Sequence, residues 1–385
     1  MSASFGTDAD SFDPVLIGAT LGLVVIGTVM VGSASISLAD RDTGEPLFFL
    51  LRHLAAIGFG TAGLLVAVSL PTQLWYRLHW ALLLLGVGLL AVVLAPAVGN
   101  SVNGAERWLA VGPLRFQASE PARLCLLMYL ASYAVRRHAA LANGFSGFFK
   151  PMLVVAVTAA LLLEEPDFGA AVVVTAASLG VLFVAGARLR DFVLAVTTAG
   201  VALATLALTS PYRLQRLTTF LDPWQHPFAS GFQLTNSLIA IGRGAWFGVG
   251  LGDSVQKLFY LPEAHTDFVF AVLTEELGFV GATVVILLFA LIVYRALAMG
   301  HRALRIGLPF QGLLSTGIGL MLGLEAFINI GVNTGLLPTK GLTLPLVSYG
   351  RSSTVISLVA LGLLMRIHHE LVVAERQPTR RGGSP

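Results

Sequence analysis

Long uninterrupted runs of apolar residues, separated by short polar stretches, dominate this chain. Membrane barrel strands would alternate apolar and polar residues, whereas each run here approaches the roughly 20 residues that a helix needs to cross a bilayer. The pattern predicts an all-α polytopic membrane protein with about ten transmembrane helices. The predicted spans are residues 15–36, 48–70, 77–98, 119–137, 150–165, 167–186, 190–209, 266–297, 307–333 and 344–366.

The composition agrees with a chain immersed in lipid. Of its 385 residues, 56% are hydrophobic and 12% are charged, about half the charged fraction of a soluble domain. The first apolar run is too long for the core of a cleavable signal peptide and follows Asp8, Asp10 and Asp13. The single cysteine, Cys125, excludes an internal disulfide and a cysteine-based metal cluster. The net charge of +3 does not indicate nucleic-acid binding, because the arginines lie at predicted helix ends.

Arginine residues collect in alternate loops between the predicted helices. Cytoplasmic loops are enriched in Lys and Arg, so this bias predicts that both termini are cytoplasmic, residues 1–14 as a short segment and 367–385 as a disordered tail. The membrane domain is then 15–366, and its longest loop, about 210–265 between spans seven and eight, is extracytoplasmic, ordered and partly re-entrant. The arginines that set this orientation are Arg77, Arg136, Arg137, Arg188, Arg190, Arg295, Arg302, Arg305, Arg376, Arg380 and Arg381.

Ionisable residues inside predicted spans are candidates for function, because a charge in lipid is costly. In the run Q-A-S-E-P-A-R at 117–123, Ser119 can cap a helix. Glu120 and Arg123 follow, three positions apart on one helix face. The structural alternative is a capped helix start with a local ion pair.

A second polar run, E-E-P-D-F-G at 164–169, separates the fifth and sixth predicted spans. Pro166 ends one helix and Asp167 can begin the next. This pattern favours a tight polar turn over a functional site.

A third polar cluster, Glu263, His265 and Asp267, lies where the long loop enters the eighth span. The spacing predicts Thr266 as a helix N-cap and Asp267 in the first turn, where the helix dipole favours a carboxylate for purely structural reasons. The chain has no Ser-His-Asp, Cys-His or zinc signature, so an enzyme built on it would use a carboxylate base. We interpret His265 as loop structure.

The fourth run, P-T-K-G-L-T-L-P-L-V-S-Y-G-R-S-S at 338–353, leads into the last span. Lys340 breaks the positive-inside bias, which is consistent with an anionic ligand. Small hydroxyl residues, Ser348 and Ser352, follow at the predicted entrance of the helix. Small residues in a span are most often a packing surface, which is the alternative here.

These motifs resemble the SEDS family (shape, elongation, division and sporulation), and its division members more than its elongation members. The resemblance extends over nearly the whole chain. The runs that carry it are G-N-S-V-N-G-A-E-R-W-L at 99–109, P-Y-R-L-Q-R-L at 211–217, F-L-D-P-W at 220–224, S-V-Q-K-L-F-Y-L-P-E-A-H-T-D-F at 254–268 and L-P-T-K-G-L-T-L-P-L-V-S-Y-G at 337–350.

The resemblance implies a peptidoglycan glycosyltransferase of the inner membrane that polymerises lipid II into glycan strands at its outer face during septal wall synthesis. Asp267 matches the essential aspartate of the family and would be the base for an inverting displacement of undecaprenyl pyrophosphate. Glu120 matches its cavity glutamate. The chain departs from the family pattern at Ala118, Arg123, Glu165, Glu325 and Arg351.

The departing pyrophosphate needs positive charge from arginine, lysine or a divalent cation such as Mg²⁺ or Mn²⁺; the sequence identifies no metal site. Two of the departures, Glu325 and Arg351, both lie within predicted spans. We predict that they pair with each other, with Glu165 as the alternative partner. The basic candidates on the outer side are Arg213, Arg216, Arg243, Lys257 and Lys340.

The resemblance also implies partners: lipid II, membrane lipid, the class B penicillin-binding protein FtsI, and the FtsQ, FtsL and FtsB subcomplex. Two other functions stay open at this point. A lipid II flippase would use a polar cavity with essential residues at the midplane or on both faces. A non-catalytic scaffold of the division complex would tolerate loss of Asp267.

Overall fold

The computed structural model describes residues 12–95, 99–102, 105–111, 114–209 and 211–376. Over these residues helices dominate, and six of them are long and apolar enough to cross a membrane: α1, α2, α7, α12, α13 and α14. The apolar helices α4 and α8 are shorter. The helices are α1 (Pro14–Thr43), α2 (Phe48–Ser69), α3 (Thr72–Arg77), α4 (His79–Val93), α5 (Ser119–Arg136), α6 (His138–Asn143), α7 (Phe145–Glu164), α8 (Phe168–Val184), α9 (Leu189–Leu208), α10 (Pro211–Leu221), η2 (Pro223–Gln225), α11 (Phe232–Gly244), α12 (Val269–Arg305), α13 (Pro309–Asn333) and α14 (Arg351–Arg376).

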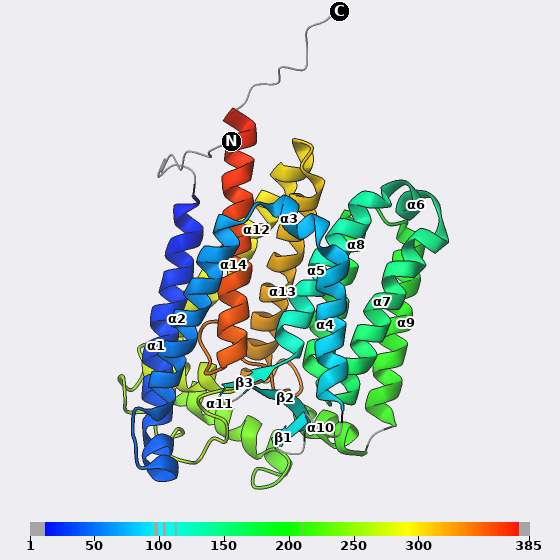
Figure 1. Ribbon diagram of the computed structural model, residues 1–385. Coiled ribbons are helices and arrows are strands. Elements are labelled where there is room, and N and C mark those ends of the chain that lie inside the picture. The colour runs from blue at the N-terminus through cyan, green and yellow to red at the C-terminus, as the bar shows by residue number, and fades with distance from the viewer. Residues whose placement is uncertain (1–11, 96–98, 103–104, 112–113, 210, 377–385) are drawn as a thin grey trace, which may run out of the picture.

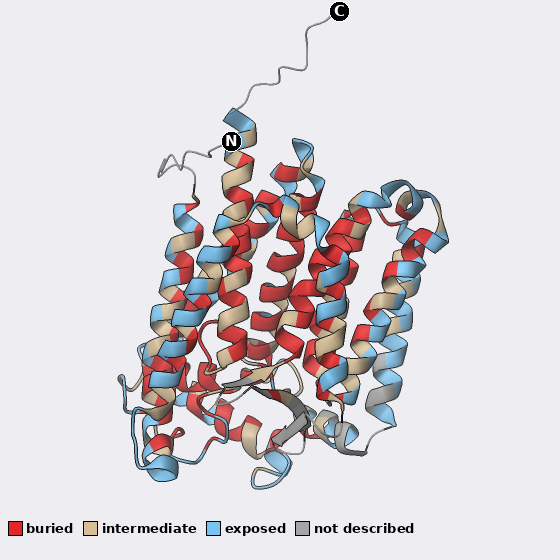
Figure 2. Cartoon of the chain, in the orientation of Figure 1, coloured by how far each residue is buried: buried red, intermediate tan, exposed pale blue. Residues whose placement is uncertain are grey.

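The long helices run side by side as a bundle with two distinct ends (Figure 1). The start of α1 and the end of α14 lie at one end. The opposite end, called here the sheet end, carries α10, α11 and a small β-sheet. Buried residues concentrate on α5, α13 and α14, whereas α2 and α9 expose much of their outer surface (Figure 2). Exposed apolar side chains on peripheral helices are the surface expected of a protein in lipid.

The mostly helical fold is consistent with the predicted all-α class, and a small three-stranded antiparallel sheet adds to it. Its strands β1 (Gly99–Val102), β2 (Ala105–Val111) and β3 (Leu114–Gln117) are in the order β1-β2-β3. Strands of four to seven residues are too short to stand out by periodicity beside long apolar helices. Because β3 ends next to the start of α5, the sheet fixes where that helix begins.

The helix boundaries differ from the predicted ones in two places that concern function. The last span was predicted to begin at 344, but α14 begins at Arg351, because the preceding residues include Pro345 and Leu346 has a left-handed backbone (φ 64°). The helix also continues to Arg376, so the prediction of a disordered tail from 367 is wrong up to that residue. The remainder, 377–385, lies outside the described residues.

The second difference lies at the start of α12. The helix begins at Val269 with Phe268 as its N-cap residue, so the prediction that Thr266 caps it and that Asp267 lies in its first turn is wrong. The Thr266 hydroxyl instead donates to Glu263 Oε2, at 2.6 Å. Asp267 is therefore a turn residue just before the helix.

A break divides α12 at Gly278, whose backbone is not helical (φ 67°, ψ −167°). Residues 245–250 fill the break. The Glu275 and Glu276 carbonyls accept from N–H groups of this segment, and the two N–H groups that follow Gly278 donate to carbonyls of the same segment. This exchange satisfies the backbone groups that the break releases, as a membrane-spanning helix requires. A Cβ on Gly278 would lie 2.3 Å from the Gly248 nitrogen, so only glycine fits.

Candidate active site

Hydrogen bonds from α13 hold the backbone of Asp267. Its carbonyl accepts hydrogen bonds from the side-chain amides of Asn329 and Asn333 on α13, at 2.9 and 3.0 Å. The residue is half-buried. Its carboxylate faces Gly341, where an added Cβ would lie 2.9 Å from Oδ2. A side chain at 341 would thus crowd the carboxylate.

The segment 338–350 lies against this turn. The Leu342 carbonyl accepts from Asn329 at 2.5 Å, so one amide contacts both the segment and Asp267. The Lys340 ammonium lies 4.1 Å from the centre of the Phe168 ring at the start of α8. The predicted residue Ser348 stabilises the segment itself, because its hydroxyl accepts from the Leu344 N–H at 2.8 Å.

Three charged side chains form a buried cluster between α5 and α13. Arg123 lies 2.5 Å from Glu120, its neighbour one turn earlier, and 2.6 Å from Glu325. Their side chains are 2%, 9% and 4% exposed, so water does not screen them. The Glu120–Arg123 ion pair of the structural alternative is therefore present, and Glu325 is a second carboxylate on the same guanidinium.

The predicted pair of Glu325 with Arg351 is not formed, which corrects the sequence analysis. Glu325 contacts Arg123, whereas Arg351 is the first residue of α14 and is half-buried. The sequence shows how deep a residue lies in a span. It does not show which face of that helix contacts a helix far away in the sequence. The alternative partner, Glu165, is fully buried at the end of α7.

A further buried carboxylate, Asp167, lies near the sheet end of α5. As predicted, it begins a helix: its side chain caps α8 by accepting from the Ala170 N–H at 3.1 Å. It also accepts from Gln117 at 3.2 Å and from Ser119 at 3.3 Å. Ser119 thus contacts Asp167 and makes no cap for α5. The candidate Ser352 accepts from the Gln117 N–H at 2.9 Å and so joins α14 to β3.

One face of α13 connects the buried cluster to Asp267. Glu325, Asn329 and Asn333 are spaced four residues apart, so they follow one another along the same face. The rise of 1.5 Å per residue separates neighbours by about 6 Å. The two asparagines bind the Asp267 carbonyl and the glutamate binds Arg123. One face of α13 thus contacts predicted site residues from two distant regions of the sequence.

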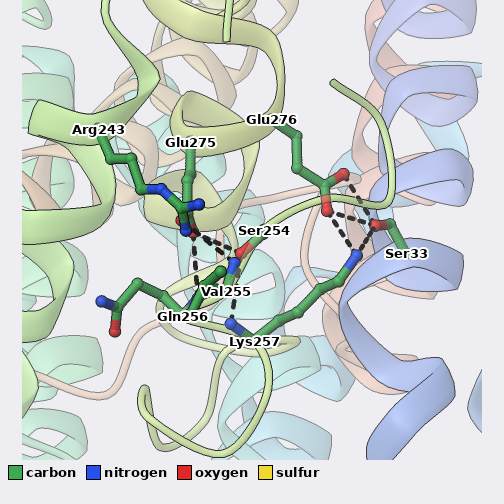
Figure 3. A network of polar contacts seen from close by, with 8 residues as sticks. All are labelled: Ser33, Arg243, Ser254, Val255, Gln256, Lys257, Glu275 and Glu276. Carbon is green, nitrogen blue, oxygen red and sulfur yellow. Dashed lines mark hydrogen bonds and ion pairs between the residues drawn. The ribbon is translucent and has the colours of Figure 1, made fainter. Parts of the chain in front are cut away.

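The basic candidates differ in their surroundings. Arg216 donates to the Thr339 carbonyl at 3.2 Å, beside the segment that contains Lys340. The side chain of Arg213 lies outside the described residues. Arg243 and Lys257 instead form ion pairs with two carboxylates of α12 that the sequence analysis overlooked, Glu275 at 3.0 Å and Glu276 at 2.7 Å (Figure 3). Glu275 and Glu276 could have been found from the sequence, because two adjacent acidic residues inside a predicted span are unusual.

His265 has the structural role that the sequence analysis assigned to it. Its buried ring packs 4.9 Å from Phe49 on α2 and 5.5 Å from Tyr349, and its carbonyl accepts from the Tyr349 N–H at 2.9 Å. Burial lowers the pKa of this imidazole below its ordinary value, against the opposing effect of Glu263. The neutral ring therefore helps to join the Asp267 turn to segment 338–350.

The fold and site define a multi-pass helical membrane protein with a half-buried carboxylate, Asp267, and a buried cluster of one arginine and two glutamates. Comparison with known proteins then gives the particular family. The family model for FtsW, RodA and SpoVE, described as "Cell cycle protein", matches residues 14–372, and the chain belongs to this family.

Individual relatives agree with this membership. A protein of Thioalkalivibrio sulfidiphilus named "Probable peptidoglycan glycosyltransferase FtsW" is 53% identical over 374 residues, which are 97% of this chain and 93% of the relative. A protein of Hahella chejuensis with the same name is 48% identical over 98% of this chain and 95% of its own length.

Solved structures are similar in fold. A chain from "Structural coordination of polymerization and crosslinking by a peptidoglycan synthase complex" has a TM-score of 0.76 at 31% identity, covering 94% of this chain and 98% of its own. The rod shape determining protein RodA of Thermus thermophilus has a TM-score of 0.69 at 31% identity, covering 93% and 97%.

Proposed function

We propose that this chain is a peptidoglycan glycosyltransferase that polymerises lipid II, with Asp267 as its catalytic base. The observation that carries the proposal is the geometry of Asp267. Its backbone is held by Asn329 and Asn333, and its half-buried carboxylate lies against the glycine of a Lys340-Gly341 pair. The turn is thus held in place by its backbone, and the residue that faces the carboxylate is a glycine. The family and the names of its relatives supply the substrate class.

In the proposed reaction, Asp267 accepts the proton of the acceptor sugar hydroxyl as that oxygen attacks the anomeric carbon of the donor. The new carbon–oxygen bond forms while the bond to the lipid pyrophosphate breaks, with inversion at the carbon. The electron pair leaves with the pyrophosphate. A sugar hydroxyl is a weak acid, so its proton moves late, and a positioned base contributes about 100- to 10,000-fold.

Pyrophosphate binding is assigned to basic residues next to this carboxylate. Lys340 and Arg216 are the best supported, because Lys340 precedes Gly341 and Arg216 contacts Thr339 of the same segment. Arg213 remains part of the proposal. Arg243 and Lys257 are poorer candidates, because they contact Glu275 and Glu276 of α12 and, among the described residues, no contact of theirs with segment 338–350 supports a place beside Asp267.

A divalent cation, Mg²⁺ or Mn²⁺, fits this site only if the substrate phosphates supply most of its ligands. Over the part of the chain that the structure describes, no group of three or more His, Cys, Asp or Glu side chains is arranged to hold a metal ion. Mg²⁺ in phosphate sites is commonly bound by one or two carboxylates plus the substrate phosphates. The cation would therefore enter with the pyrophosphate.

The buried Glu120–Arg123–Glu325 cluster is proposed to shape the substrate site, with Ser348 and Ser352 supporting its walls. Glu325 lies on the face of α13 that also holds Asp267 through Asn329. Any shift of the cluster would therefore reach the base through a rigid helix.

The test is polymerisation of labelled lipid II by the purified protein together with its transpeptidase partner, followed on a gel. Asp267→Asn keeps the size of the side chain and removes its basicity, so we expect normal insertion and loss of the glycan ladder. Asp267→Glu should also be impaired, because the extra methylene displaces the base from an oxygen it must approach to about 3 Å. Glu263→Gln is the matched control, since this exposed carboxylate belongs to the same turn.

A purified Asp267→Asn protein that polymerised at nearly the wild-type rate would remove Asp267 from the mechanism, and Glu120 would be the next base to test. Transbilayer movement of lipid II without a glycan product would support the flippase. A wild-type protein that showed neither activity but still bound its partners would support a scaffold.

The proposed topology has ten crossings, both termini in the cytoplasm and the 210–265 region outside. It is supported by the arginine bias and by the common end of α1 and α14 in Figure 1. In a Cys125→Ser background, Phe228→Cys should react with an impermeant maleimide in intact cells, because Phe228 is 91% exposed. Ile306→Cys, at the opposite end of α12, should react only after permeabilisation. The reverse result would overturn the orientation.

The proposed partners are a class B penicillin-binding protein of the FtsI type and the FtsQ, FtsL and FtsB subcomplex, at the division septum. A similar solved chain comes from a peptidoglycan synthase complex, which supports a crosslinking partner. Co-purification with each candidate from membranes tests this assignment.

A further inference from the structure

The first part of α12, residues 269–277, is a separate block between the Asp267 turn and the break at Gly278. Two adjacent buried glutamates at its end point to different neighbours (Figure 3). Glu275 accepts from Arg243 at 3.0 Å, from Ser254 at 2.5 Å, and from the Val255 and Gln256 N–H groups at 3.2 and 3.3 Å. This carboxylate binds the block to the long loop.

Glu276 binds the block to a different helix. Its carboxylate accepts from Lys257 Nζ at 2.7 Å and from the Ser33 hydroxyl of α1 at 2.6 Å. Lys257 Nζ also donates to the Ser33 oxygen at 2.8 Å, which closes a triangle of three polar groups. The Lys257 and Glu276 side chains are 7% and 0% exposed. The lysine charge is therefore engaged inside the protein, away from solvent.

The block has no continuous helical connection to the rest of α12. At Gly278 the helical hydrogen bonds are replaced by bonds to residues 245–250. The loop and the two carboxylates therefore help to determine where the block lies, together with Asn333 of α13, whose Oδ1 accepts from the Ala271 N–H at 3.1 Å. Asp267 precedes the block by two residues. A change in the position of the block therefore moves the turn that carries the proposed base.

We propose that Glu276 and Lys257 are positioning residues for Asp267, and that Lys257 is not a ligand of the pyrophosphate. The proposal rests on the function proposed above. The pair fixes the 269–277 block against α1, and the block sets the direction from which the Asp267 carboxylate approaches the acceptor hydroxyl. A displacement of about 1 Å far from the chemistry can cost about 100-fold in rate.

The test is a double-mutant cycle on purified protein with lipid II, measuring kcat and KM separately. Lys257→Met and Glu276→Gln should each lower kcat by about 10- to 100-fold and leave KM within about 2-fold. The double variant should be no worse than the more impaired single variant, because both substitutions disrupt the same contact. Lys257→Arg should recover most of kcat, and Ser33→Ala, which removes only a hydroxyl, should have a smaller effect.

The matched control is Arg295→Met. Arg295 also joins α12 to α1, because it forms an ion pair at 2.6 Å with Asp13, the N-cap residue of α1. It lies, however, in the part of α12 beyond the break. It should therefore leave kcat near the wild-type value. Thermal unfolding of every variant separates loss of folding from loss of rate, and Ser33→Ala gives the mildest perturbation if the charge variants fail to fold.

Two results would overturn the proposal. If Lys257→Met raised KM while Glu276→Gln did not, and the two effects added, Lys257 would act on the substrate. If the folded single variants kept wild-type kcat while Asp267→Asn was inactive, the block would not position the base. An active Asp267→Asn protein would instead refute the proposed function, so the two failures can be told apart.

Discussion

Removal of the Arg123 guanidinium gives a direct measure of the buried charge cluster. Arg123→Met leaves Glu120 and Glu325 facing each other without the cation that lies 2.5 and 2.6 Å from them. Neither carboxylate side chain is more than 9% exposed, so water cannot replace the lost partner. Breaking a buried pair by removing one member costs about 3–5 kcal/mol. We expect a loss of that size in the free energy of unfolding.

The assay is equilibrium unfolding in mixed micelles of a mild detergent and dodecyl sulfate. Glu325→Gln alone should cost about 1 kcal/mol, because an amide oxygen can still accept from Arg123 and Glu120 remains as its counterion. Glu325→Gln in the Arg123→Met background should restore stability, and adding Glu120→Gln should restore more, since neutral replacement of a whole buried ion cluster is often tolerated. Simply additive losses would refute the reasoning and show that Arg123 and Glu325 are not coupled.

Three further outcomes are expected. Gly278→Ala should sharply reduce the yield of folded protein, because its Cβ would meet the Gly248 backbone at 2.3 Å; Gly88→Ala, with open space around it, should be neutral or slightly stabilising by thermal unfolding. The lowered pKa of His265 means that protonation favours the unfolded chain, so wild-type stability should fall as the pH drops below about 6.5. His265→Phe should lose that pH dependence while keeping the ring packing.

Each of the six described helices that are long and apolar enough to cross a membrane overlaps a predicted span, because a membrane imposes a simple rule of length and apolarity. The ends of helices obey local chemistry that this rule does not cover. Thr266 suited an N-cap by type, yet its hydroxyl binds Glu263 and the helix begins three residues later. Only the turn geometry around Glu263, which has a positive φ of 56°, decides between these outcomes.

The sequence identified several residues of the site but not which distant residues they contact. Asp267, Glu120 and Arg123 were selected by type and motif, and the last two do pair. The partner of Glu325 was missed because α5 and α13 are 202 residues apart at this contact, and sequence does not say which faces meet. Glu276 was missed for a different reason: its signal, a carboxylate within an apolar run, was present in the sequence.

The hydrogen bonds to the Asp267 carbonyl have a consequence for biosynthesis. Their donors, Asn329 and Asn333, are synthesised 62 and 66 residues after Asp267. Likewise, Ser352, which accepts from the Gln117 N–H, is synthesised 235 residues after Gln117. A nascent chain released after α12 contains every residue of the Asp267 turn but none of the amides that hold it. The site therefore cannot form while its residues are being translated. It forms only after the last third of the protein has been synthesised and inserted.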